Sequence, residues 1–370
     1  MRRTIPPAAL AVAMALVVTG PAAARHQDPV SAAAAATVDG RVFTAARASF
    51  AVGIALENPE YGASATLERT LNEVAASGAR WVRFDIKWAD VQWHGRSSYN
   101  WSKYDSLIGA ARARGLQVLG NLAYSPTWAR PRGTSDKFAP NTRQRRIAFA
   151  RFAGAAARRY RGRVQAWEIW NEPNNPMFWQ PRPNAASYAA LVRRTYRALK
   201  RRAPRSTVLA GATAPARTAG GWIDEVAFLR RFYRAGGRRH FDAWSHHPYD
   251  FKLPPGTRNK DSAWWQTYGA RPSIRSVMRK HGDGAKKVWA TEYGLPSGGY
   301  AGLSEAVQAL WLRKAFAQWR AFPWGGPVFN YMLRDGVVSG IASYWYHIGL
   351  VRGDWTRKPA FAVVQRAAAP

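Results

Sequence analysis

The chain has 370 residues, with 55 Lys or Arg against 22 Asp or Glu, so its formal net charge is +33 at pH 7. It contains no cysteine, which excludes a disulfide framework, a thiolate metal site and a lipid-modified cysteine anchor. A chain of this length can instead draw its stability from a sizeable hydrophobic core.

Residues 1–24 have the pattern of a secretory signal peptide. Arg2 and Arg3 precede an almost wholly apolar stretch at 8–18, and the small residues after it are of the kind that a signal peptidase accepts. The apolar stretch is shorter than the roughly 20 residues of a membrane-spanning helix. We therefore expect a cleaved signal and a secreted, extracellular protein in preference to a membrane anchor. Residues 25–45, which are rich in alanine, are expected to be a disordered lead-in.

Short apolar strands alternate with amphipathic helices along the rest of the chain. We expect strands at 49–55, 81–87, 116–122, 164–171, 206–212, 241–247, 286–292 and 326–333. We expect helices at 65–77, 101–114, 141–160, 184–202, 221–235, 271–281, 302–321 and 358–367. Eight strand–helix units predict an α/β fold with a single (β/α)8 barrel. A doubly wound open sheet is the alternative, but no glycine-rich dinucleotide motif follows any strand.

Two glutamates close strands of this predicted barrel. The fourth strand leads into WEIWNEPN at 167–174 and the seventh into VWATEYG at 288–294, so Glu172 and Glu292 fall at carboxyl ends of strands, where barrel enzymes place their catalytic residues. Retaining cleavage of a glycosidic bond uses two carboxyl groups about 5–5.5 Å apart. A lone glutamate at a strand end is more often a loop or capping residue. Two at matching heights favour a catalytic pair.

The wider motifs resemble a known clan of enzymes. NEP at 171–173, together with Glu292, resembles the retaining glycosidases of clan A, which carry paired glutamates on strands four and seven. WEIWNEPNNPMFW at 167–179 is similar to family 39, the β-xylosidases and α-iduronidases, and HPY at 247–249 also resembles the cellulase-like family 5. The resemblance implies that 46–370 is the catalytic domain of a secreted retaining glycoside hydrolase that cleaves a β-linked polysaccharide or oligosaccharide.

The resemblance also implies roles for individual residues. Glu172 would be the acid/base, Glu292 the nucleophile, and Asn171 the partner of the sugar 2-hydroxyl. Strand alternation, taken by itself, places Trp170 on the inward face with Glu172, and it places residues 288 and 290 on the inward face with Glu292.

Three further residues of the pattern would support this pair. Tyr249 would orient Glu292, Arg83 would keep it ionised, and His247 would contact the substrate or support the acid/base. Glu168 shares an inward parity with Arg83, so we expect it to neutralise that side chain without a catalytic role.

Aromatic side chains near the strand ends are candidates for stacking on sugar rings. Trp179, Trp88 and Trp128 follow strands four, two and three in the predicted loops. Members of the clan usually have a tryptophan at the end of strand eight, where this chain has NYM, so Tyr331 or Trp345 is expected to replace it. For each of these residues, packing in the core is the alternative.

No cofactor or metal ion is expected. His246 and His247 are adjacent on a strand and point to opposite faces, so they cannot share an ion. The arginines are scattered along predicted helices and form no nucleic-acid motif. We interpret the charge as a solvated surface, with an acidic polysaccharide as a candidate partner. We expect a monomer with no membrane span and no specific nucleic-acid ligand. A carbohydrate-binding barrel that has lost turnover, or a binder of anionic polymers, is the alternative function.

Overall fold

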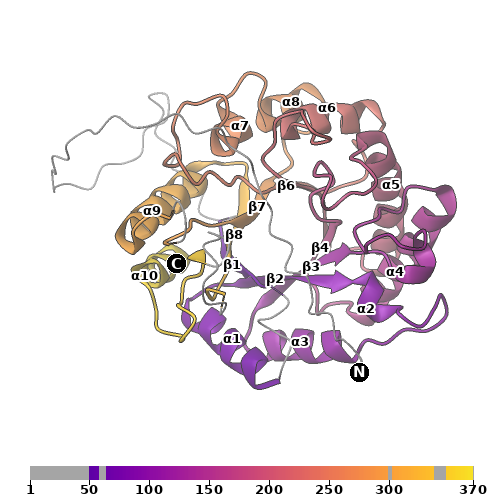
Figure 1. Ribbon diagram of the computed structural model, residues 1–370, viewed down its shortest axis with the longest axis horizontal. Helices are drawn as coiled ribbons and strands as arrows, with labels where there is room; N and C mark the ends of the chain where they lie inside the picture. Colours follow the sequence, from indigo (N-terminus) through magenta and orange to yellow (C-terminus); the bar gives the residue numbers. More distant parts are fainter. Residues whose placement is uncertain (1–49, 58–63, 299–301, 337–346, 370) are drawn as a thin grey trace, which may run out of the picture. The chain divides into compact units, whose positions relative to one another are not determined.

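The computed structural model describes residues 50–57, 64–298, 302–336 and 347–369. The expected signal peptide and the lead-in at 25–45 lie outside these residues. Eight strands pair in parallel and in chain order to form a closed barrel, with the last strand returning to the first (Figure 1). The strands are β1 (Val52–Ala55), β2 (Trp81–Lys87), β3 (Gln117–Ala123), β4 (Ala166–Ile169), β5 (Thr207–Thr213), β6 (Ala243–His246), β7 (Val288–Tyr293) and β8 (Gly325–Tyr331). The predicted (β/α)8 barrel is confirmed.

Helices surround this barrel on all sides in Figure 1. The eight that sequence periodicity predicts are α1 (Ser64–Ala76), α3 (Ser102–Ala113), α4 (Arg143–Arg159), α5 (Ala185–Arg202), α6 (Glu225–Arg234), α8 (Ile274–Lys280), α9 (Glu305–Ala321) and α10 (Pro359–Ala368). Three shorter elements were not predicted, because one or two turns show no clear period. They are α2 (Trp88–Val91), the 3-10 helix η2 (Thr127–Ala129) and α7 (Ala263–Tyr268).

Capping side chains set where several helices begin. Thr142, Asn184 and Asp224 precede α4, α5 and α6, and each accepts a hydrogen bond from the backbone N–H three residues further on. Such a cap satisfies one of the backbone donors that the first turn leaves free. Helix α6 therefore begins at Glu225, later than the position 221 that its apolar pattern suggested.

Large aromatic rings fill the inside of the barrel below its carboxyl end. Trp81 and Trp289 meet edge to face with ring centroids 5.3 Å apart, and Phe329 packs against both. Glycine makes this possible, because a Cβ at Gly53 would lie 2.4 Å from the ring of Phe329, and one at Gly326 would lie 2.3 Å from the ring of Trp289. A second and larger apolar layer lies between the strands and the helices. Among the described residues, no helix has the length and hydropathy that crossing a bilayer requires.

Candidate active site

Polar side chains from four strands meet at the carboxyl end of the barrel. Arg83 comes from β2 and Glu292 from β7, while the other members follow β4 or β6 directly. All are buried except the half-buried Glu172. The group consists of Arg83, Asn171, Glu172, His247, Tyr249 and Glu292. The structure thus brings together the six polar residues that the sequence motifs single out.

Arg83 is the centre of this network. Its Nε donates to Oε2 of Glu168 at 2.7 Å, its Nη1 donates to Oε1 of Glu292 at 2.6 Å, and its Nη2 donates to Oδ1 of Asn171 at 3.0 Å. The residue is only 4% exposed. Burial alone would lower the pKa of Arg83, but Glu168, Glu292 and Asp85 raise it well above its usual value. The expected ion pair between Arg83 and Glu168 is therefore present, and the guanidinium stays charged.

Both carboxylate oxygens of Glu292 have donors. Oε1 accepts from Arg83, and Oε2 accepts from the hydroxyl of Tyr249 at 2.9 Å. Burial, together with the charge of Glu292, raises the pKa of Tyr249 well above its usual value. Because the tyrosine keeps its proton, it remains a donor that fixes the orientation of the carboxylate.

Glu172 is held by two other groups. Its Oε1 lies 3.1 Å from Nδ1 of His247, and its Oε2 accepts from Nδ2 of Asn175 at 2.6 Å. The same Nδ1 atom lies 3.6 Å from Oε2 of Glu292. Burial would lower the pKa of His247, but Glu292 and Glu172 raise it above its usual value. Asn175 was missed from the sequence, although an amide three residues past the glutamate was a signal that could have been used.

The two glutamates lie close to each other. One oxygen of Glu172, one oxygen of Glu292 and a ring nitrogen of His247 all lie within 4.8 Å of one another. Three such atoms could in principle ligate a metal ion. However, the guanidinium of Arg83 already balances Glu292 at 2.6 Å, and its charge opposes a second cation. His246 takes no part, because its Nδ1 lies 2.8 Å from the carbonyl oxygen of Thr213.

The backbone after β4 places Asn171 and Glu172 differently from a continuing strand. Trp170 and Glu172 have φ values of 67° and 43°, in the left-handed region that side chains other than glycine rarely adopt. The strand ends at Ile169, so its alternation stops there. Trp170 turns outward into the helix layer, where its Nε1 donates to the carbonyl of Phe178 at 2.7 Å. The prediction that Trp170 points inward with Glu172 is wrong.

A similar correction applies to β7. Trp289 fills the barrel interior, so Val288 and Ala290 face the helix layer and not the interior, contrary to expectation. The pairing of β7 with β8 shifts between Ala290 and Tyr293. Such an irregularity interrupts simple alternation, and Glu292 points to the barrel mouth although Ala290 points outward.

Of the expected sugar-stacking aromatics, Tyr331 lies beside the site. Its ring meets that of Tyr249 edge to face at 6.2 Å, and its hydroxyl donates to a carboxylate oxygen of Glu57. Trp179 is only 1% exposed. It packs between Trp170 and Tyr188, with ring centroids 5.7 and 5.6 Å away, so it has no free face for a sugar and its predicted binding role is wrong.

The remaining candidate aromatics are Trp88, Trp128 and Trp345, and the two that the structure describes differ in how deeply they are buried. Trp88 is fully buried against Phe149 and Phe152 and belongs to the core. Trp128 is half-buried and donates from Nε1 to the carbonyl of Gln92 at 2.8 Å. Trp345 lies outside the described residues.

Two acidic residues on the β1–β3 side of the mouth were not assigned to the site from the sequence. Burial raises the pKa of Glu57, two residues past β1, and the charges of Asp85 and Glu292 add to this. Asp85 accepts from Nδ2 of Asn121 at 2.7 Å. Their position near the carboxyl ends of β1 and β2 was the available signal, but neither belongs to a recognisable motif.

Solved structures share this fold. A family 39 glycoside hydrolase from the gut symbiont Bacteroides cellulosilyticus matches with a TM-score of 0.68 and 23% identity, over 86% of this chain and 63% of that one. A monomeric beta-xylosidase from Caulobacter crescentus matches with a TM-score of 0.65 and 18% identity, over 86% and 68% of the two chains. GH5_18 from Streptomyces cattleya, in complex with GlcNAc, matches with a TM-score of 0.63 and 19% identity, over 86% of this chain and 79% of that one.

These comparisons bear out the expected likeness to families 39 and 5 at the level of the barrel fold. The chain spans about two thirds of the length of the first two structures, 63% and 68%. No family model matches the sequence, and no curated protein matches it either.

Proposed function

We propose that this chain is a retaining glycoside hydrolase that cleaves a β-linked polysaccharide or oligosaccharide outside the cell. The observation that carries the proposal is the approach of Glu172 and Glu292 at the barrel mouth. A carboxylate oxygen of one lies within 4.8 Å of a carboxylate oxygen of the other. Retaining enzymes hold their two carboxyl groups about 5–5.5 Å apart, whereas inverting enzymes need about 6.5–9.5 Å to admit a water molecule. The shared fold with glycoside hydrolases supports the same reaction class.

Glu292 suits the role of nucleophile. Arg83 and Tyr249 hold one oxygen each, so the carboxylate is oriented and its negative charge is stabilised. In the first step, an oxygen of Glu292 bonds to the anomeric carbon as the bond from that carbon to the leaving oxygen breaks. The product of this step is a glycosyl ester on Glu292.

Glu172 suits the role of acid and base. In the first step its carboxyl proton passes to the leaving oxygen. In the second step Glu172 takes a proton from water, the water oxygen bonds to the anomeric carbon, and Glu292 is released. His247 and Asn175 hold the two oxygens of Glu172, which keeps the proton-carrying group in place for both steps.

Asn171 suits the binding of the sugar that is attacked. Arg83 donates to its Oδ1, which leaves Nδ2 of the amide as the donor for a ring hydroxyl. A hydrogen bond to the 2-hydroxyl strengthens as the transition state forms. Tyr331 and Glu57 stand beside the same space and are candidates for contacts to the other hydroxyls.

The test is a substrate screen in which the first-formed product is followed by NMR. Purified protein is incubated with aryl β-glycosides, xylan, β-glucans and mannan, alongside the variants Glu292→Gln and Glu172→Ala. We expect wild type to release the β-anomer first. Glu292→Gln should lose activity on the order of 10⁴-fold or more. Glu172→Ala should retain more activity on activated aryl glycosides than on polysaccharide, with partial rescue by azide.

Glu68→Gln is the matched control, because it makes the same change at an exposed carboxylate on α1, and it should keep full activity. Near wild-type turnover by Glu292→Gln, or release of the α-anomer first, would overturn the proposal. Saturable sugar binding without turnover by any of the proteins would favour the carbohydrate-binding barrel.

A further inference from the structure

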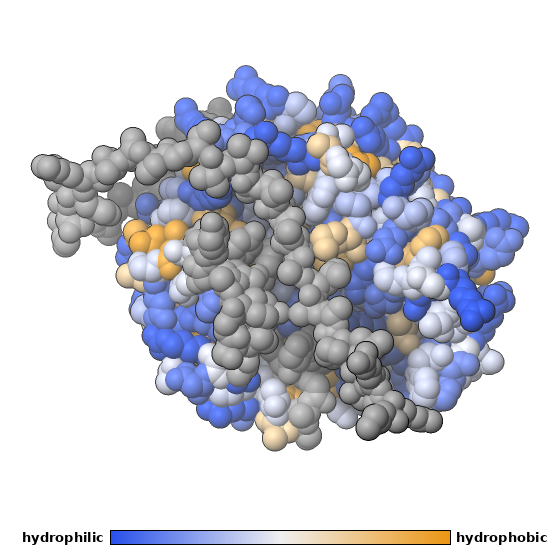
Figure 2. Space-filling model, in the orientation of Figure 1, coloured by the Kyte–Doolittle hydropathy of each residue, from blue (hydrophilic) through white to orange (hydrophobic). Residues whose placement is uncertain are grey.

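Positive charge is concentrated on one part of the helical layer. Helices α4, α5, α6 and α8 follow one another around the barrel (Figure 1). There are six basic residues in each of α4 and α5, and three in each of α6 and α8. The one acidic residue in these four helices is Glu225, which is buried. Figure 2 shows strongly hydrophilic residues along the edge of the molecule over these helices.

A groove runs between α4 and α5, with a volume of about 600 Å³. Its floor is made of small residues, since Gly154 of α4 faces Ala198 of α5, where a Cβ on the glycine would be only 3.6 Å from the alanine Cβ. Long side chains rise on both sides of this floor. They are Arg151 and Arg158 of α4 and Arg194, Arg197, Arg201 and Arg202 of α5, which are all exposed. We call the groove that these six residues border the arginine groove.

No acidic residue that the structure describes neutralises the arginine groove. In the described part of the chain, no carboxylate forms an ion pair with any of its six arginines, and Nη2 of Arg197 lies 3.4 Å from Nε2 of His240. Arg159, next to Arg158 but on the side of α4 that faces α3, pairs with Asp105 at 2.5 Å. Burial, together with the charges of Arg194 and Arg193, lowers the pKa of Arg146 beside the groove. The positive potential is therefore specific to this side of α4.

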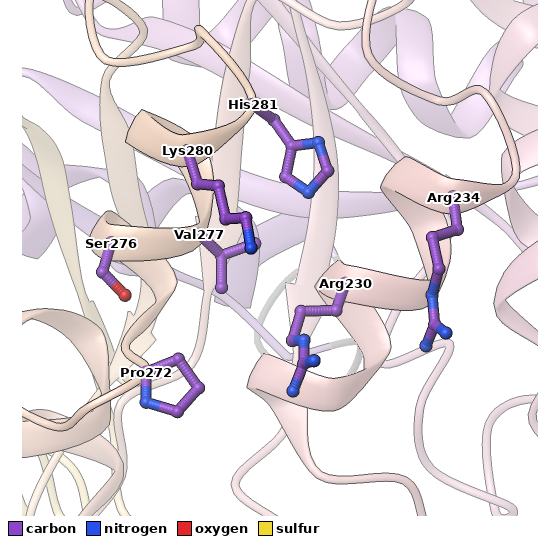
Figure 3. A pocket seen from close by; sticks show the side chains of 7 residues that line it. All are labelled: Arg230, Arg234, Pro272, Ser276, Val277, Lys280 and His281. Atoms are coloured by element: carbon purple, nitrogen blue, oxygen red, sulfur yellow. The ribbon is translucent and has the colours of Figure 1, made fainter.

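A second pocket, of about 430 Å³, continues the basic surface between α6 and α8. Figure 3 shows Arg230 and Arg234 on one side of this pocket and Lys280 on the other. The ring of His281 at its upper end stacks on Tyr233, with centroids 4.2 Å apart. Because α5 contacts α6 and α6 contacts α8, this pocket and the arginine groove lie on the same stretch of the helical layer.

We propose that the arginine groove, extended by the α6–α8 pocket, binds an anionic polysaccharide on the outer wall of the barrel. Arg151 and Arg158 are seven residues apart, as are Arg194 and Arg201, which places successive charges roughly 10 Å apart along each helix. A single small anion cannot reach both members of such a pair, but a linear polymer with repeated charges can. Guanidinium groups bind carboxylate, sulfate and phosphate oxygens through two parallel hydrogen bonds.

The groove favours a polysaccharide over a nucleic acid. Binding of single strands relies on aromatic side chains that stack on successive bases, whereas Tyr99 is the one aromatic residue among those that line the arginine groove. The choice of a polysaccharide also rests on the proposed glycosidase function. Since the groove lies on the helical layer and the glutamate pair at the barrel end, a bound polymer would hold the protein on an acidic matrix without occupying the catalytic site.

The test uses two probes with the same backbone, dextran sulfate and neutral dextran, with polygalacturonate as a carboxylate polymer. Duplex DNA, single-stranded DNA and vesicles with anionic headgroups form separate arms. Binding of the full chain is measured at several salt concentrations. The test variant replaces Arg151, Arg158, Arg194 and Arg201 by Gln.

The control variant removes the same amount of charge elsewhere. It carries Gln at the exposed positions Arg80, Arg313, Lys314 and Arg366, which lie outside the four basic helices. We expect wild type to bind both acidic polymers and not dextran. The groove variant should bind on the order of tenfold more weakly, with a shallower salt dependence, while the control variant stays close to wild type. Turnover of an aryl β-glycoside should be unchanged in both variants.

The outcomes separate this proposal from the catalytic one. Equal weakening in both variants would show an effect of net charge and overturn the site, as would tighter binding to DNA or vesicles than to the acidic polymers. Groove-specific binding by a protein with no glycosidase activity would leave the site standing and remove the proposed function. A third variant with Lys at the same four positions keeps the charge and should retain most of the binding. This variant distinguishes the loss of charge from an effect of changing these four side chains on folding.

Discussion

Arg83 at the barrel mouth and Arg158 on the outer wall carry the same charge in opposite surroundings. Arg83 is buried and donates to three acceptors, two of them carboxylates. Arg158 is exposed and faces other arginines across a groove. A buried charge must be paired, because desolvation is otherwise too costly, whereas water solvates an exposed charge. Only the exposed arrangement leaves a positive potential that can act on another molecule.

The largest expected effect comes from breaking the buried network. Arg83→Met leaves Glu168 and Glu292 buried without their cation, so we expect the free energy of unfolding to fall by about 3–5 kcal/mol. Urea denaturation at pH 7 measures this change. Arg158→Met is the matched control and should alter stability by less than about 0.5 kcal/mol. Similar values for the two variants would show that burial does not distinguish these arginines.

A smaller effect is expected at Glu225, which is buried like Arg83 but has no cationic partner in the described structure. It is 1% exposed and accepts from the backbone N–H of Ala216 at 3.0 Å. Burial, with a contribution from Asp224, raises the pKa of Glu225 from 4.5 to about 8. Between these two pH values the folded protein keeps this proton while the unfolded chain releases it, which favours unfolding. The free energy of unfolding is therefore highest below pH 4.5 and falls as pH rises towards about 8.

Glu225→Gln tests this assignment. The amide can still accept from Ala216 but does not titrate. We expect the variant to exceed wild type in unfolding free energy at pH 9 by an amount on the order of a few kcal/mol, and to match it near pH 4. Thermal unfolding across this range gives the profile. Parallel profiles for the two proteins would contradict a neutral, buried Glu225.

The smallest effect concerns the arginine groove itself. Arg194→Gln with Arg201→Gln removes like charges from one face of α5, so we expect a gain of a few tenths of a kcal/mol in unfolding free energy at low salt. The gain should shrink in 1 M salt, where screening acts over about 3 Å. A loss of stability at low salt would mean that these side chains hold the fold together, which would weaken the case for a surface kept for a partner.

The strand order and the position of the glutamate pair were predictable because they depend on local pattern. Alternating apolar strands and helices predict the barrel, and the strands that end near Glu172 and Glu292 put both at its carboxyl end. The side on which individual residues lie was less predictable. The left-handed backbone at Trp170 and the shifted register before Tyr293 are tertiary features that reverse the simple alternation.

Other residues were missed for different physical reasons. Trp179 follows the motif of the fourth strand and looks like a sugar platform, yet its burial depends on Tyr188 of α5, a contact that sequence spacing does not reveal. The arginine groove was seen in the sequence only as scattered charge. Its asymmetry appears once α3 is known to supply Asp105 to Arg159, while α5, which has no acidic residue, supplies further arginines to the other side of α4.

The aromatic cluster of Trp81, Trp289 and Phe329 leaves the barrel interior open at one end alone. Its rings close the interior beneath Arg83, so a sugar chain cannot thread along the barrel axis and a cleaved fragment cannot leave through the bottom. Under the proposed function, substrate would arrive and both products would depart through the same mouth. A polymer cut at the glutamate pair would then lie across the strand ends, with the sugars on either side of the broken bond next to the loops that follow the strands.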